Sequence, residues 1–397
     1  MDWPHDTAPT PDRSCRRASG AKPDGHIAPA SIRVWDIGVR IFHWTLLAAV
    51  TVAAATGFLA PRNWLNLHIA AGVGIATLVI FRLVWGFTGT TYARFASFAV
   101  SPRQVMERVI ELRQGRARRF LGHNPLGAVM VLMLLAVLCC LVISGAVALG
   151  GTDKQGPFAV ATSFAVGEAS RRLHAALALV LVGLVAAHIA GVLFESLTSR
   201  ENLVWALVSG WKAGAPPAVV ARRRRALPRH AAIVLSALVV VGVPIIIAYS
   251  SLPGLGVPDD TLDASYVGEC GACHIAYHPS LSPAATWSAL LDGLKNHFGE
   301  DASLDPETTA RLRDYLTSIS AEYWDTRAAN LFRIRDGAEP LRLTATPAWM
   351  RLHRHVAPAL FASKAVGRAG ACAACHQDAA SGRFDPQAIS LPSEMKP

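Results

Sequence analysis

The chain has 397 residues, of which 52% are apolar and only 17% are charged, and its mean hydropathy is +0.33. An ordinary soluble domain carries about 25% charged residues, so this composition disfavours a disordered protein, a nucleic-acid-binding protein and a purely soluble enzyme. The net charge of +10 is unevenly placed, because residues 1–250 hold 25 Lys and Arg against 11 Asp and Glu, whereas residues 251–397 hold 13 against 17.

The first part of the chain alternates between polar and long apolar stretches. Residues 1–30 lack apolar periodicity and are predicted to be a disordered tail, not a secretory signal, because the first long apolar run begins only after Arg40. Five later segments have the length of about 20 residues that a membrane-spanning helix needs. They are 41–60, 65–87, 125–149, 171–197 and 231–250.

Basic residues between these segments predict their orientation. The connection 90–124 carries seven arginines, and the connection 198–230 carries six arginines and one lysine. The connections 61–64 and 150–170 hold only Arg62 and Lys154. By the positive-inside rule, the amino terminus and the arginine-rich loops are cytoplasmic, and the chain leaves the fifth span outside the inner membrane of the cell.

The residues after a Pro/Gly linker at 251–260 have the composition of a small soluble domain. Runs at 283–294 and 306–319 indicate short amphipathic helices, and no strand-like alternation stands out. We therefore expect an all-α protein. Its predicted parts are a cytoplasmic tail (1–30), a four-helix membrane domain (31–215), a basic loop with a fifth membrane helix (216–250) and a periplasmic domain (251–397).

The sharpest motifs are two Cys-x-x-Cys-His strings in the last part of the chain. They place Cys270 and Cys273 before His274, and Cys372 and Cys375 before His376. A c-type heme needs two thiols that add to its vinyl groups, followed by a histidine that binds the iron. A zinc site is the alternative, but it would have to be assembled from both strings. The motifs therefore predict two covalent c-type hemes.

Four histidines lie within the first four predicted spans, where ionisable side chains are costly and usually functional. His174 and His188 share one span, about 40° apart around the helix axis and roughly 21 Å apart along it. Matching by depth pairs His43 with His188 near the inner boundary and His68 with His174 near the outer one. Two bis-histidine b-type hemes within a four-helix bundle are the prediction. His123, without a partner at its depth, is interpreted as an interfacial or capping residue.

Each c-type heme iron also needs a second axial ligand from the outer domain. The candidates are His278, His297, His353, His355, Met350 and Met395. His297 follows a helical run and is favoured for one iron. The spacing alone does not separate His353 from His355 for the other.

The membrane part resembles the prokaryotic cytochrome b561 family, which includes the cytochrome b subunits of nickel-iron hydrogenases. The resemblance covers about 31–215 and rests on RVWDIGVRIFHW at 33–44, FRLVWG at 81–86, ARF at 93–95 and GHNPLG at 122–127. It implies two b-hemes bound from the first, second and fourth helices, with a 14-residue spacing that matches His174 and His188. It also implies electron exchange with membrane quinone.

The outer part looks like the dihaem cytochrome c family. The matching stretches are ECGACH at 269–274, NHFGED at 296–301 and CAACH at 372–376. The resemblance implies bis-histidine hemes whose second ligands correspond to His297 and, with a less definite alignment, His353.

Together these features predict a transmembrane electron-transfer protein, and they leave open whether it is itself a quinol oxidoreductase. The main hypothesis is quinol oxidation, with electrons passing through two b-hemes and two c-hemes to a soluble periplasmic acceptor. The alternative is a membrane anchor and electron-relay subunit bound to a hydrogenase or another periplasmic oxidoreductase. Neither the direction of electron flow nor the quinone site follows from the sequence.

Overall fold

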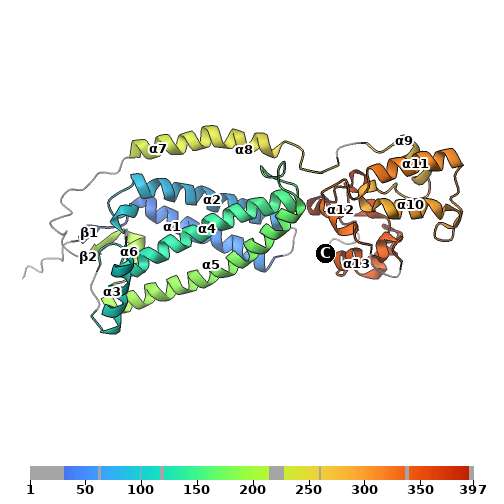
Figure 1. Cartoon of the computed structure of the whole chain (residues 1–397). Coiled ribbons are helices and arrows are strands. Elements are labelled where there is room, and N and C mark those ends of the chain that lie inside the picture. The colour runs from blue at the N-terminus through green and yellow to red at the C-terminus, as the bar shows by residue number, and fades with distance from the viewer. Residues whose placement is uncertain are drawn as a thin grey trace, which may run out of the picture.

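The computed structural model describes residues 31–60, 64–98, 100–116, 120–213, 228–258, 261–335 and 339–392. The predicted tail 1–30 and most of the basic loop before the fifth span lie outside this part. The described residues form an elongated, almost entirely helical molecule, with a helical bundle at one end and a smaller helical domain at the other (Figure 1). The all-α prediction is confirmed.

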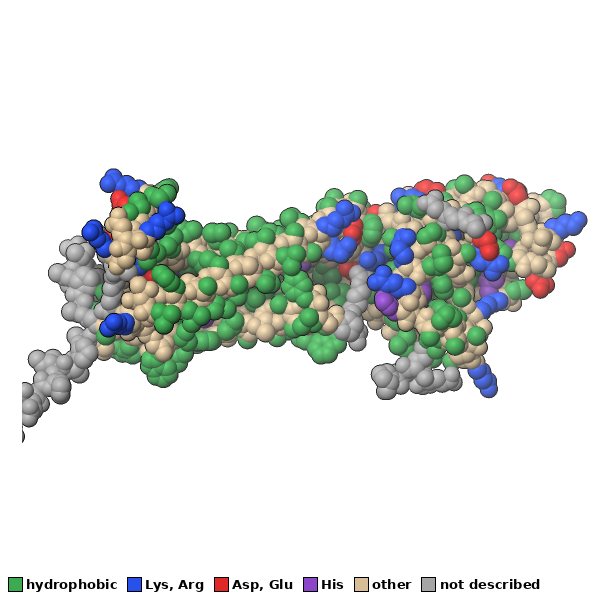
Figure 2. All heavy atoms as spheres, turned by 90° about the horizontal axis from the view of Figure 1, so that it is seen from below, with side chains coloured by type: hydrophobic (Ala, Val, Ile, Leu, Met, Phe, Trp, Pro, Cys, Tyr) green, Lys and Arg blue, Asp and Glu red, His purple; other side chains and the backbone are tan. Residues whose placement is uncertain are grey.

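Four long helices make up the bundle, and each is apolar and long enough to cross a membrane. Side-chain caps begin three of them, since Asp36, Asn124 and Ser163 each accept a hydrogen bond from a backbone N–H in the first turn. The helices are α1 (Ile37–Phe58), α2 (Leu65–Thr88), α4 (Pro125–Thr152) and α5 (Phe164–Ser199). Apolar side chains cover the lateral surface of the bundle, and charges gather at its ends and on the smaller domain (Figure 2).

A cluster of aliphatic side chains packs in the interior of the bundle, half-way along the helices. Ile75, Val79 and Leu138 are buried there, and residues of α1 and α5 pack around them. At one end, α4 and α5 approach so closely that a Cβ on Gly151 would lie 2.5 Å from the Cα of Gly167. The sequence predicted α5 to start near residue 171, but the Ser163 cap starts it seven residues earlier.

The end of the bundle at which α1 begins is closed by short elements, and we call it the strand end. Strands β1 (Ser31–Arg33) and β2 (Trp211–Ala213) pair antiparallel, Ile32 opposite Lys212. Around them lie η2 (Phe95–Ser97), α3 (Pro102–Arg113) and α6 (Leu203–Ser209). A capping box between Ser101 and Gln104 starts α3. The opposite end faces the smaller domain, and we call it the domain end.

The fifth predicted span is a separate helix that runs alongside α2 (Figure 1). It consists of α7 (Pro228–Ala237), a π-helical stretch η4 (Leu238–Gly242) and α8 (Val243–Ser250). Pro244 falls in the first turn of α8, where its missing N–H costs least. The π-helical turn just before this proline is the local adjustment that keeps the helix continuous.

The smaller domain contains short helices around two apolar cores. One core holds Tyr266, Trp287, Leu312 and Leu316, and the other holds Leu281 and Phe332 among others. The longer helices are α9 (Ala264–Cys270), α10 (Ala284–Asp292), α11 (Pro306–Ser318), α12 (Arg327–Phe332), α13 (Pro347–His353) and α14 (Pro358–Phe361). The 3₁₀ turns are η5 (Pro279–Leu281), η6 (Leu294–Asn296), η7 (Leu343–Ala345), η8 (Cys372–Ala374), η9 (Ala379–Ser381) and η10 (Pro386–Ala388).

Candidate functional site

Eight histidines predicted as iron ligands lie in the structure as four facing pairs. In the bundle, the ring centres of His43 and His188 are 6.5 Å apart at the strand end, and those of His68 and His174 are 6.1 Å apart at the domain end. In the smaller domain the separation is 6.2 Å both for His274 with His297 and for His353 with His376.

These separations fit two imidazoles that bind one metal ion from opposite sides. A metal–imidazole bond is about 2 Å long and the nitrogen lies about 1 Å from the ring centre, so the two centres should be about 6 Å apart. No cluster of three or more His, Cys, Asp or Glu side chains suited to a metal ion occurs in the described part of the chain. Each pair would therefore fit a heme iron held between its two imidazoles. A structural zinc site needs four donors, which the described residues do not gather at any of these pairs.

Hydrogen bonds to Nδ1 orient four of these rings, so that Nε2 is the atom left for iron. His68 Nδ1 lies 3.1 Å from the Ala53 carbonyl and 3.1 Å from the Thr56 hydroxyl. His174 Nδ1 is 3.0 Å from the Leu141 carbonyl and 3.3 Å from the Ser144 hydroxyl. A backbone carbonyl can only accept, so each Nδ1 carries the proton, the arrangement typical of a metal-bound histidine.

The same arrangement recurs in the smaller domain. His274 Nδ1 donates to the carbonyl of Ile275 at 2.7 Å, and His353 Nδ1 donates to the carbonyl of Trp349 at 2.9 Å. These carbonyl and hydroxyl partners of the rings are functional groups that the sequence analysis missed. The Thr56-to-His68 and Ser144-to-His174 contacts join different helices, so no local spacing indicates them.

Glycines stand where the bundle helices approach the domain-end pair. A Cβ on Gly57 would lie 3.2 Å from Cε1 of His68, and a Cβ on Gly145 would lie 3.0 Å from Cε1 of His174. Larger residues at these two positions would crowd the imidazoles. The helix backbones therefore come close to both rings because these positions are glycine.

The two cysteine strings each fold as a tight turn that ends at the histidine. Cys270 is the last residue of α9, and Cys273 is exposed one turn later. In the second string, η8 spans Cys372–Ala374, and the His376 N–H donates to the Cys372 carbonyl at 2.8 Å. We call the groups around Cys270, Cys273, His274 and His297 the first cysteine site. Those around Cys372, Cys375, His376 and His353 form the second cysteine site.

The structure separates the remaining ligand candidates of the smaller domain. His353 faces His376, whereas His355 is exposed and its Nε2 accepts from Arg354 Nε at 2.8 Å. His278 is buried, but its Nδ1 is already used, because it accepts the Ser280 N–H at 3.1 Å. This hydrogen bond caps the start of η5. Burial also lowers the pKa of His278 to about 4, which keeps the ring neutral. Met350 is exposed, and Met395 lies outside the described residues.

His123, interpreted from the sequence as an interfacial or capping residue, precedes α4 at the strand end. Its ring packs between Trp35 and Phe98, with centres 5.0 Å and 4.7 Å away. Burial, together with the smaller effect of the positive charges of Arg82 and Lys212, lowers the pKa of His123 to about 4. Its buried Nδ1 has no hydrogen-bond partner among the described residues, and the lowered pKa keeps this half-buried imidazole neutral next to the strand-end pair.

The strand end also contains a network around one carboxylate. Asp36 caps α1 and accepts hydrogen bonds from Trp85 Nε1 at 3.1 Å and from Thr90 Oγ1 at 2.5 Å. Arg82 is buried beneath Phe95, with its guanidinium carbon 4.9 Å from the ring centre, and its Nη1 has no partner among the described residues. A buried, unpaired guanidinium N–H near the strand-end pair suits a carboxylate such as a heme propionate.

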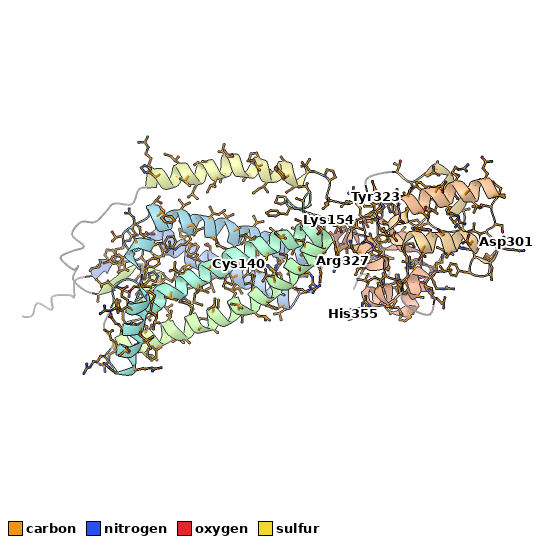
Figure 3. The ribbon with its side chains drawn as sticks, viewed as in Figure 1. Cys140, Lys154, Asp301, Tyr323, Arg327 and His355 are labelled. Carbon is orange, nitrogen blue, oxygen red and sulfur yellow. The ribbon has the colours of Figure 1, made fainter. Side chains whose placement is uncertain are left out.

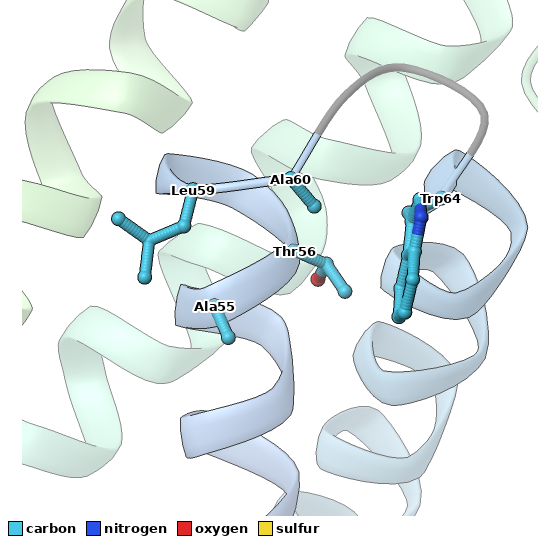
Figure 4. A pocket seen from close by; sticks show the side chains of 5 residues that line it. All are labelled: Ala55, Thr56, Leu59, Ala60 and Trp64. Carbon is cyan, nitrogen blue, oxygen red and sulfur yellow. The ribbon is translucent and has the colours of Figure 1, made fainter. Parts of the chain in front are cut away.

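An open pocket lies at the domain end of α1 and α2. It is lined by Ala55, Thr56, Leu59, Ala60 and Trp64, and its volume is about 310 Å³ (Figure 4). Its wall is mostly apolar, and the Thr56 hydroxyl that lines it is the one that contacts His68. The pocket therefore borders the domain-end pair.

Comparisons with known proteins divide the chain in the same way. Residues 34–210 match the prokaryotic cytochrome b561 family, and residues 266–384 match the dihaem cytochrome c family. One relative is a probable Ni/Fe-hydrogenase B-type cytochrome subunit from Rhodobacter capsulatus, 25% identical over 45% of this chain and 80% of the relative. A subunit of the same description from Rhizobium leguminosarum bv. viciae is 27% identical over 49% of this chain and 93% of the relative.

Solved structures match the smaller domain. A diheme cytochrome c from Shewanella baltica OS155 is 34% identical, covering 33% of this chain and 93% of its own, with a TM-score of 0.27. The Rhodobacter sphaeroides protein DHC is 35% identical, covering 32% of this chain and 100% of its own, with a TM-score of 0.25.

These matches and the five apolar helices identify an integral membrane protein for electron transfer that uses b-type and c-type heme. The bundle carries the histidine pairs without nearby cysteine strings, and the smaller domain carries both strings. The chain therefore belongs, over residues 34–210, to the prokaryotic cytochrome b561 family and, over residues 266–384, to the dihaem cytochrome c family.

Proposed function

We propose that this chain oxidises quinol in the membrane and delivers the electrons to a soluble periplasmic redox protein. The single observation that carries the proposal is the alignment of four opposed histidine pairs along one elongated molecule. Two pairs lie in an apolar bundle, and two lie in a polar domain beyond it. One quinol supplies two electrons and releases two protons, and each electron then crosses the chain singly.

In this proposal the eight histidines hold two b-type and two c-type hemes, and the four string cysteines bind the latter covalently. A heme with two axial imidazoles exchanges one electron at its iron and leaves no position open for a substrate. The chain's own residues set the positions of the sites and exclude water between them. Ile75, Val79 and Leu138 fill the space between the two bundle pairs, which favours electron exchange without proton uptake there.

We further propose that the strand end is cytoplasmic and that the smaller domain is periplasmic. The arginine-rich connections adjoin the strand end, and the connections at the domain end hold few basic residues. Attachment of c-type heme outside the cytoplasm in bacteria requires the same orientation. The domains 31–215, 216–250 and 251–397 would then be the membrane domain, the basic loop with its extra helix, and the periplasmic domain.

A second candidate function is that of membrane anchor and electron-relay subunit for a hydrogenase. It is favoured by the relatives described as Ni/Fe-hydrogenase B-type cytochrome subunits, which match the bundle. In that case a catalytic subunit would remain bound to the purified chain.

The test is rapid mixing of the oxidised full chain, purified in lipid nanodiscs, with a short-chain quinol. Reduction of both b-type and c-type absorbance within the turnover time supports the main proposal. A chain that quinol leaves oxidised, but that co-purifies with a catalytic subunit able to reduce it, supports the relay function and overturns quinol oxidation. A pyridine hemochrome assay on the same sample should give equal amounts of b-type and c-type heme.

A further inference from the structure

The second cysteine site lies on the side of the smaller domain that contacts the bundle. Gln155, in the loop between α4 and α5, donates to Asp385 at 2.8 Å and accepts from Gln387 at 3.1 Å. The segment that contains these two residues also packs on the site, because the Phe384 ring lies 5.2 Å from the His376 ring and Ile389 pairs with His376. One polar layer therefore separates the second cysteine site from the bundle loop.

Asp325 holds the two parts of the molecule together. Its Oδ2 accepts from Lys154 Nζ at 2.7 Å and from the Phe164 N–H, the first N–H of α5, also at 2.7 Å. The Lys154 side chain is 7% exposed and the Asp325 side chain is 28% exposed, so this ion pair is partly shielded from water at the junction. A carboxylate at the amino end of α5 is also stabilised by the helix dipole.

The linker between the two parts is fixed at the same place. The Asp325 N–H donates to the Gly256 carbonyl at 2.8 Å, and Gly256 has a φ of +65°. A Cβ on Gly256 would lie 2.6 Å from the Cβ of Asp325, so this approach requires glycine. Leu255 N–H donates to the Ala159 carbonyl of the bundle loop at 2.8 Å. The smaller domain is thus docked on the bundle and is not merely tethered to it.

The first cysteine site lies at the opposite end of the smaller domain. Figure 3 places Asp301, four residues after His297, at the tip farthest from the bundle, and it places Lys154 and Arg327 at the junction. Phe298, next to His297, is 49% exposed. Residues 261–318, which surround this site, contain eight Asp and Glu against three Lys and Arg, whereas residues 319–392 contain six against nine.

Tyr277 connects the two cysteine sites. Its ring centre lies 5.1 Å from that of His274, and its hydroxyl donates to the Gly370 carbonyl at 2.9 Å, two residues before Cys372. Arg368 adds a second link, since it donates to the Cys273 carbonyl at 2.8 Å. The two sites are therefore neighbours within one packed unit.

From these contacts we infer that the c-type sites act in the reverse of their order in the sequence. The second cysteine site exchanges electrons with the domain-end pair His68 and His174, and the first cysteine site is the outermost and meets the soluble partner. Asp325 is the positioning residue that maintains this order. In each step one ferrous iron is oxidised and the next ferric iron is reduced, with no transfer of protons or atoms. The inference rests on the proposed function for the direction of flow and for the soluble partner.

Docking is tested on the unmodified full chain with a carbodiimide, which joins an amine to a carboxylate in contact with it. We expect a Lys154–Asp325 cross-linked peptide by mass spectrometry, and we expect none in an Asp325→Asn variant. As a control, exposed carboxylates should react with an added amine under the same conditions. If they do, but the native protein gives no Lys154–Asp325 peptide, the domain is not docked this way.

The order is tested by reducing the b-type hemes with a light flash and then measuring how fast the c-type hemes become reduced, from their absorbance. In Asp325→Asn, transfer from b-type to c-type heme should slow about tenfold, because the docked population falls when one partner of a shielded pair is lost. Lys154→Gln should act alike, and Asp301→Asn at the far tip should leave this step unchanged. Heme content and c-type potentials should be unaltered in all three variants.

Equal rates in Asp325→Asn, Lys154→Gln and the native chain would overturn the inference, as would a slowing confined to Asp301→Asn. Neither outcome depends on quinol, because the electron is injected by light. If quinol fails to reduce the native chain while these rates and the cross-link behave as expected, the quinol proposal fails and the order of the sites stands.

Discussion

The His353 ring lies nearly parallel to the Trp349 ring, with ring centres 4.3 Å apart and planes inclined by 22°. Its Nδ1 also donates to the Trp349 carbonyl. Stacking and this hydrogen bond together hold His353 toward His376, whereas His355 points to solvent beside Arg354. The choice between the two histidines, open from the sequence, thus has a geometric answer that can be measured.

We expect His353→Ala to convert one c-type heme from a low-spin to a high-spin spectrum, because its iron loses one of two axial imidazoles. The covalent heme content should not change, since Cys372 and Cys375 are intact. Carbon monoxide should then bind to the reduced variant. His355→Ala is the matched control and should keep the native spectrum, and a high-spin signal in that variant alone would reverse the assignment.

The membrane pairs should be separable by single substitutions. His174→Ala and His188→Ala should each remove about half of the non-covalent heme, because each pair loses one of its two ligands. The pyridine hemochrome assay measures this loss, and the c-type content is the internal reference. His123→Ala is the control, since His123 lies near the strand-end pair but packs against Trp35 and Phe98 and belongs to none of the four facing pairs. A variant at His174 or His188 that retains all b-type heme would contradict the pairing.

A buried ion pair at the strand end should matter for stability. The guanidinium of Arg108 is 3.1 Å from the carboxylate of Glu195, and the Arg108 side chain is 1% exposed. Glu195→Gln should lower the free energy of unfolding by about 2 kcal/mol, because the buried guanidinium loses the closer of its two carboxylates and keeps Glu111 at 3.6 Å.

The exposed pair of Arg103 and Glu107 on α3 supplies the control for this effect. Glu107→Gln should change stability by at most about 0.5 kcal/mol. Thermal unfolding of both variants in the same detergent, followed by circular dichroism, tests the difference. Similar midpoints for the two variants would indicate that the Arg108–Glu195 pair contributes little.

Acidification should destabilise the smaller domain through His278. The folded pKa of His278 is about 4, against about 6.5 in an unfolded chain. The unfolded state therefore binds more protons between these values, so the stabilisation is complete above pH 6.5 and is lost as the pH falls toward 4. The full effect is about 3 kcal/mol.

His278→Asn provides the comparison, because its side-chain oxygen can still accept the Ser280 N–H but does not titrate. The midpoint of thermal unfolding should fall less between pH 7 and pH 5 in this variant than in the native protein. The difference between the two curves isolates His278 from the other histidines. Parallel curves would show that another group controls the acid sensitivity.

Much of the architecture is readable from the sequence, because long apolar runs and histidine spacing are strong local signals. The five spans lie within a few residues of their expected positions, and the histidines expected to share a depth face each other. The largest boundary error is at α5, where the sequence shows a polar stretch but the helix continues from Ser163 to meet the smaller domain.

What the sequence does not reveal depends on contacts between distant segments. His353 and His355 are two residues apart, and only the end of α13 at His353 separates their directions. Arg82 of α2 lies beneath Phe95 of η2, which is a different element. Lys154 pairs with Asp325, which is far away in the chain. No periodicity records such contacts, so the spatial order of the two cysteine sites needed the structure.

One helix, α5, carries one histidine of each bundle pair. The rise of an α-helix sets the distance between His174 and His188 at roughly 21 Å, whatever the surrounding lipid. A thinner or thicker bilayer changes the tilt of such a helix more readily than its length. The separation of the two hemes proposed for these pairs would therefore be insensitive to lipid composition, and the tunnelling rate between them should be the same in membranes of different thickness.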